Sequence, residues 1–70
     1  MTESSSPAIR HKTTLLIQQQ FYVSEERAQQ LAVAALEGIE SHGGNPNNWD
    51  TIEKTVNVVV ASWIKSGRPL

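Results

Sequence analysis

The sequence contains no cysteine among its 70 residues. Disulfide bonds and thiolate metal sites are therefore excluded, although small domains often depend on them. A chain of this length buries only about 60% of the surface that its unfolded form exposes, so its own core is marginal. Association with a second subunit is the remaining source of stability, and we therefore expect a homodimer.

Histidine is also scarce, because the chain has only His11 and His42, which lie in different segments. Structural zinc normally takes four ligands at regular spacing, so we expect no metal and no other cofactor. Gly43 and Gly44 are not followed by the Lys-Ser/Thr pair of a phosphate-binding loop. Two short helices also leave little room for a catalytic pocket, which predicts a protein that is not an enzyme.

Long hydrophobic runs are missing as well. No apolar stretch approaches the roughly 20 residues that are needed to cross a bilayer. The beginning, MTESSSPAIRHK, lacks the apolar core of a secretory signal. These features predict a cytoplasmic protein.

Charge of one sign does not dominate, since the formal net charge is −1. A globally basic nucleic-acid-binding protein is therefore not indicated. The charges are nevertheless uneven: residues 24–53 carry six acidic side chains and one basic one, whereas residues 54–70 carry three basic side chains and no acidic one. Solvated helix faces explain this pattern, and so does an acidic surface that meets a basic partner.

The first segment of the sequence is rich in serine and contains one proline. Residues 1–11 combine three of the serines with Pro7 and contain few apolar side chains, which predicts a flexible tail. We expect a single small helical domain over residues 12–67, followed by a short tail over residues 68–70.

The segment TTLLIQQQFYV, residues 13–23, has two interpretations. As a helix it places Leu16, Ile17 and Phe21 on one face, together with Gln20. As a strand it alternates, and its end, FYV, contains residues that prefer pleated sheets. Leucine and glutamine favour a helix at its start. We prefer the helix and keep the strand as the alternative.

The next helix has clear boundaries. Ser24 is a good N-cap, and Glu25 and Glu26 follow it where negative charge complements the helix dipole. The helix is predicted to extend to about Ser41, and Gly43 can adopt the positive φ that ends it. Its apolar positions recur at steps of three and four, and half of them are small: Ala28, Leu31, Ala32, Ala35, Leu36 and Ile39.

A further helix begins in the stretch HGGNPNNWD, where two starts compete. Asn45 can cap a helix that begins at Pro46, whereas Asp50 can form a capping box with Glu53. Trp49 is in phase with the apolar positions that follow, which favours the start at Pro46. The helix should end near Lys65 or Ser66.

The apolar stripe of this last helix has steps of three and four: Trp49, Ile52, Val56, Val59 and Trp63, widened by Val60 and Ile64. Val58 lies off the stripe. An apolar residue in that position indicates that a second face of the helix is buried, as it would be in a dimer.

Together these patterns predict an all-α fold, an antiparallel helical hairpin with a short extra helix or strand at its N-terminal side, and a homodimer. The corresponding function is a small regulatory interaction module, an adaptor or inhibitor that binds itself and another protein. Large aromatic residues dominate interface energetics, although each is also able to lie in the domain's own core. The candidate contact residues are Trp49, Tyr22, Asn47, Asn48 and Trp63.

An alternative comes from the segment QQQFYVSEERAQQLAVAALEGIESHGGN, which resembles a ribbon-helix-helix layout. The resemblance implies a dimeric DNA-binding transcriptional regulator or antitoxin, with Gln18, Gln20 and Tyr22 directed outward from a two-stranded ribbon. Glutamine is able to read adenine edges in the major groove. The acidic middle of the chain opposes this alternative, because phosphate repels it.

Overall fold

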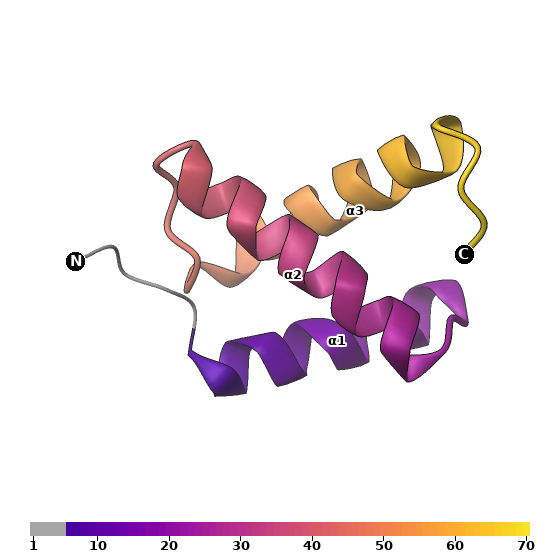
Figure 1. The fold of residues 1–70 in the computed structure, drawn as a ribbon. Helices are drawn as coiled ribbons and strands as arrows, with labels where there is room; N and C mark the ends of the chain where they lie inside the picture. Colours follow the sequence, from indigo (N-terminus) through magenta and orange to yellow (C-terminus); the bar gives the residue numbers. More distant parts are fainter. Residues whose placement is uncertain (1–5) are drawn as a thin grey trace.

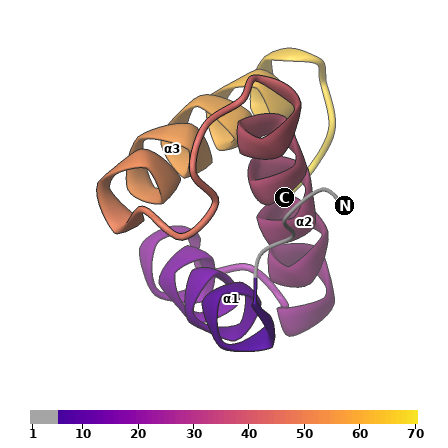
Figure 2. The same cartoon turned by 90° about the vertical axis from the view of Figure 1, so that its left-hand side faces the viewer.

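A computed structural model describes residues 6–70 as three α-helices in sequence, α1 (Pro7–Phe21), α2 (Glu25–Ser41) and α3 (Trp49–Lys65). This part of the chain contains no strand, which confirms the prediction of an all-α fold. Figure 1 shows the helices linked by a short turn and a longer loop. Helix α2 packs against both α1 and α3 and lies between them in Figure 1. The second view shows α1 and α3 on the same side of α2 (Figure 2).

Helix α1 begins earlier than the sequence suggested. The side-chain oxygen of Ser6 accepts a hydrogen bond from the backbone N–H of Ile9 at 3.3 Å, and Pro7 occupies the first helical turn. Proline is favoured there because its fixed φ suits a helix and its missing N–H needs no partner. Residues 7–11 are therefore helical and not part of a flexible tail, while residues 1–5 of the predicted tail lie outside the described residues.

The strand alternative for residues 13–23 is wrong, because α1 continues to Phe21. Tyr22 then ends the helix in the left-handed conformation, with φ of 53°. No ribbon exists in the described chain, so the ribbon-helix-helix layout is not adopted. The preferred helical interpretation is confirmed.

The buried face of α1 differs from the predicted one, because it includes two threonines. Thr13, Thr14 and Ile17 are buried, whereas Gln20 is exposed. The hydroxyl groups of Thr13 and Thr14 donate to the backbone carbonyls one turn earlier, at 2.7 and 2.8 Å. These bonds satisfy the polar atoms and allow threonine to pack in an apolar core.

Helix α2 matches its prediction closely. Ser24 caps it by accepting from the N–H of Arg27 at 3.2 Å, and the helix ends at Ser41. Gly43 adopts a φ of 77° just beyond the end. All six predicted apolar positions are buried and form most of the core, together with Ile17 of α1 and Ile52, Val56 and Val60 of α3.

The start of α3 corrects both predicted caps. The side-chain oxygen of Asn48 accepts from the N–H of Thr51 at 3.2 Å, so the helix begins at Trp49. Asn45 instead bonds the N–H of Asn47 at 2.9 Å within the loop. Pro46 is buried in that loop, which anchors it against the domain before the helix begins.

The apolar stripe of α3 is buried at its centre and half-buried at its ends. Ile52, Val56 and Val60 are buried, but Ile64 is 54% exposed and does not widen the stripe as predicted. Val58 is 65% exposed, in agreement with its expected place off the stripe. Gly67 adopts a φ of 85° beyond the helix end.

Candidate interaction surfaces

Trp63 is half-buried against the core and holds the end of the chain. Its indole N–H donates to the backbone carbonyl of Pro69 at 3.2 Å. The guanidinium groups of Arg27 and Arg68 lie 5.1 and 4.7 Å from its ring centre. Each distance is within the range of a cation–π interaction, so the ring links α2 and the C-terminal residues to α3.

Trp49 has a similar internal partner at the other end of α3. The ammonium group of Lys12 lies 4.3 Å from the Trp49 ring centre, and the ring is half-buried against the core. This contact joins the first half of α1 to the start of α3. Sequence analysis missed Lys12, because its spacing from Trp49 follows no helical or strand period.

The five candidate contact residues do not form one site. Trp49, Asn47 and Asn48 lie around the start of α3, beyond the last turn of α2. Tyr22, which is 92% exposed, and Trp63, which contacts Arg27, lie by the first turn of α2. A helix of 17 residues is about 25 Å long, so the two groups are at opposite ends of the domain.

The proposed DNA-reading residues are also separated. Gln18 is half-buried and Gln20 is exposed, and both belong to α1. Consecutive helical residues are rotated by about 100°, so Gln18 and Gln20 lie on opposite sides of the helix. The outward row of Gln18, Gln20 and Tyr22 that a ribbon would create does not exist here.

A shallow apolar hollow of about 410 Å³ lies between the second half of α2 and the first half of α3. We call it the α2–α3 surface. It is mostly uncharged at its centre, and it includes the most exposed valine of the chain, Val58. Its principal lining residues are Gly38, Ile39, Thr55, Val58 and Val59, with Lys54 and His42 at the edge.

Gly38 makes this surface unusually open. A Cβ atom built on Gly38 would meet no atom within 4 Å apart from its own helix and neighbours. Glycine inside a helix costs roughly 0.5–1 kcal/mol relative to alanine. No contact among residues 6–70 requires this glycine, so its absent side chain leaves room for atoms from outside the domain.

The two sides of this surface differ in charge. On α3, Lys54 and Lys65 are exposed, and they lie four residues before and seven residues after Val58 on the same helix face. On α2, Glu37 is rotated by about 100° from Gly38 and lies on the same side of the helix as Val33, four residues earlier, away from this surface. The surface therefore has a basic edge along α3 and no acidic lining residue.

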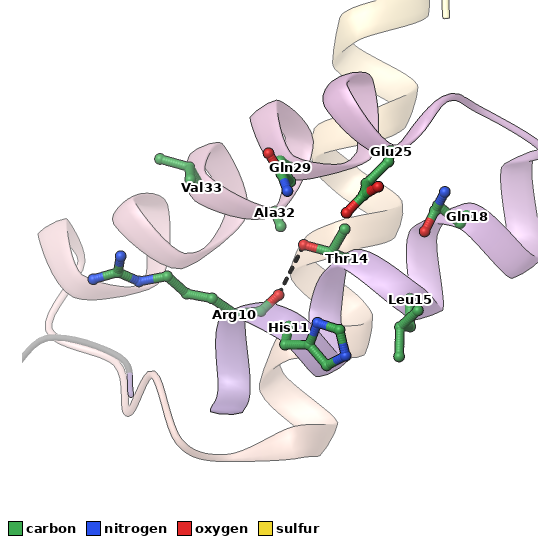
Figure 3. A pocket seen from close by; sticks show the side chains of 9 residues that line it. All are labelled: Arg10, His11, Thr14, Leu15, Gln18, Glu25, Gln29, Ala32 and Val33. Carbon is green, nitrogen blue, oxygen red and sulfur yellow. Dashed lines mark hydrogen bonds between the residues drawn. The ribbon is translucent and has the colours of Figure 1, made fainter. Parts of the chain in front are cut away.

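A second hollow, of about 330 Å³, lies between α1 and α2. We call it the α1–α2 groove. Figure 3 shows its side chains, with Arg10 and Val33 toward one end, Glu25 and Gln18 toward the other, and Thr14 and Ala32 between them. The remaining lining residues are His11, Leu15 and Gln29.

The two hollows lie on opposite flanks of α2. Gln29 lines the α1–α2 groove, and Gly38, nine residues later, lines the α2–α3 surface. Nine residues make about two and a half turns of an α-helix, so Gln29 and Gly38 lie on opposite sides of α2. A molecule bound on one flank therefore leaves the other flank accessible.

Among residues 6–70, no three or more histidine, aspartate or glutamate side chains gather to hold a metal ion. None of the three helices has the length and apolar character needed to cross a membrane. Searches against protein-family models, curated proteins and solved structures find no match. The structure itself defines the class of protein as a small all-α domain with a hollow on each flank of its central helix.

Proposed function

We propose that this chain is a non-catalytic, regulatory protein-interaction module that acts as a homodimer through its α2–α3 surface. The observation that carries the proposal is the exposed Val58 beside the open backbone of Gly38. The cytoplasmic location expected from the sequence belongs to the same proposal. No DNA-binding function is proposed, because the ribbon that it needs is missing from the described chain.

A second copy fits this surface by shape. In a two-fold symmetric dimer the same patch is used by both subunits, so it must complement itself. The α2–α3 surface is lined both by an exposed valine, Val58, and by Gly38, which has no side chain. Each Val58 is then able to fill the space over Gly38 of the other copy, and glycine lets the helices approach closely.

The charges of this surface do not attract a second copy, because its lysines lie on α3 and none of its lining residues is acidic. The apolar centre supplies the driving force, because its burial removes apolar area from water.

Sedimentation velocity over a concentration series tests the proposal. We expect a dimer at tens of micromolar and a melting temperature that rises with concentration, because a dimer is stabilised by mass action. Val58→Asp should weaken dimerisation by about 100-fold or more, since each dimer would bury two unpaired carboxylates. A cooperatively folded monomer in the wild type would refute the dimer.

The matched control is Val33→Asp, which places the same charge on the other flank of α2. Val33 is 43% exposed and lies outside the α2–α3 surface, so this variant should dimerise like the wild type. Equal dimerisation of the Val58→Asp variant and the control would assign the dimer to a different surface.

A further inference from the structure

We infer that the α1–α2 groove binds an amphipathic helix of a partner protein, which carries an acidic residue over Arg10 and a basic residue over Glu25. The inference rests on the proposed interaction role but not on the dimer. It names the kind of partner that such a module takes, and its test is independent of self-association.

The apolar content of the groove supports a helical occupant. Leu15 from α1 and Val33 from α2 are each 43% exposed, and Ala32 is buried between the two helices. Two packed helices form a groove into which the apolar ridge of a third helix fits. Leu15 contributes little to the core, so its exposed half is free to contact such a ridge.

An extended peptide fits less well, for reasons of hydrogen bonding. Residues 6–70 contain no strand, so they offer no sheet edge to pair with a peptide backbone. Only side-chain groups such as those of Gln18 and Gln29 are available in the groove. A helix satisfies its own backbone and needs only side-chain contacts, which is the helix-in-groove mode of recognition.

The charges of the groove specify the occupant further. Arg10 lies toward one end and Glu25 toward the other, with His11 between Arg10 and Leu15 (Figure 3). Along α1 the groove extends from Arg10 to Gln18, which is about 12 Å or roughly two helical turns. The partner helix should therefore carry its acidic and basic residues about two turns apart.

The same charges predict the direction of the partner helix. Acidic residues are favoured in the first turn of a helix and basic residues in the last turn, because they complement the macrodipole. The first turn of the partner should consequently lie over Arg10, at the N-terminal side of α1, and its last turn over Glu25. The partner helix would then run in the same direction as α1.

The groove remains open in the proposed dimer, since it lies on the opposite flank of α2 from the α2–α3 surface. A dimer would present two such grooves. Partners that carry two suitable helices would gain affinity from simultaneous binding where the geometry allows it.

Fluorescence anisotropy with designed peptides tests the inference. The probe is a labelled alanine- and leucine-rich helix of about 14 residues, a length at which helices become marginally stable in water. It carries glutamate in its first turn and lysine two turns later. We expect it to bind about fivefold or more tightly than peptides with glutamate at both positions or lysine at both positions.

Variants of the protein sharpen the test. Leu15→Asp should weaken binding of the matched peptide by about tenfold or more, because it places a charge against the apolar ridge. Arg10→Glu should reverse the ranking, so that the peptide with lysine at both positions binds best. An unchanged ranking with Arg10→Glu, or equal affinity for all three peptides, would overturn the inference.

The control is Val58→Asp, which should bind the matched peptide like the wild type while failing to dimerise. If Val58→Asp unfolds, Gly38→Leu replaces it as the variant that should not dimerise, because leucine fills the open space at Gly38. Leucine also has a better helix propensity than glycine, so this variant should fold. Circular dichroism establishes that each variant is folded. A wild-type dimer that binds no peptide would overturn the groove inference alone, whereas a monomer that binds the matched peptide would overturn the dimer alone.

Discussion

The two flanks of α2 differ in what they offer to another molecule. The α2–α3 surface has an uncharged apolar centre with Val58 and the open Gly38, whereas the α1–α2 groove has charges at both ends and a narrower apolar centre. Apolar area drives association without specifying a partner, and charge specifies a partner while contributing little energy. One helix can therefore combine self-association on one side with selective recognition on the other.

Both flanks of α2 depend on the same hydrophobic core. A substitution that unfolds this core should have the largest effect, because it abolishes binding at both flanks. Leu31 is 0% exposed at the centre of α2. Leu31→Ala should lower the free energy of unfolding by about 2–5 kcal/mol, most of what a domain of this size has. Urea denaturation measures this loss. Retained peptide binding in a variant that no longer folds cooperatively would contradict the dependence of the groove on the core.

Trp63→Ala should have the next largest effect and tests whether this ring serves the fold or a partner. The ring is half-buried, so we expect a loss of about 2 kcal/mol, less than the 3–5 kcal/mol of a fully buried tryptophan. Thermal unfolding measures it. Because the ring lines neither hollow, dimerisation and peptide binding by the folded variant should not change. A selective loss of either would show that Trp63 is a contact residue, as the sequence predicted.

Salt concentration should distinguish binding at the two flanks without any mutation. Raising sodium chloride from low to high concentration screens exposed charges, so peptide binding in the groove should weaken by about threefold to tenfold. Dimerisation should change by less than about twofold, because its centre is apolar. Equal salt dependence of the two equilibria would remove the distinction between the flanks.

Lys12→Gln should have the smallest effect. It removes the cation over Trp49, a contact that contributes about 0.5–1 kcal/mol at an exposed site. Thermal unfolding should show this loss, and both binding equilibria should remain as in the wild type, because Lys12 lines neither hollow. Lys12→Arg, which keeps a cation, is the matched control and should retain most of the stability.

Local sequence signals were sufficient where the determinants are close in the chain. The boundaries of α2 are determined by the Ser24 cap at its start and by Gly43 beyond its end, each of which acts within a few residues. Gly67 lies in the same way beyond the end of α3. The start of α3 was harder, because Asn45, Asn48 and Asp50 are all able to cap a helix and lie within six positions, and only Asn45 and Asp50 were considered. The buried Pro46 draws the loop against the domain, which leaves Asn48 as the cap.

The amino-acid sequence by itself determined that this chain forms helices, where α2 begins and ends, and which face of α2 is buried. Helical periodicity and capping act over one or two turns, so these properties can be read from neighbouring residues. Only the tertiary structure decided that Lys12 meets Trp49, that Thr13 and Thr14 are buried, and that Gly38 faces open space. These outcomes depend on how whole helices pack, because contacts between distant segments follow no local period.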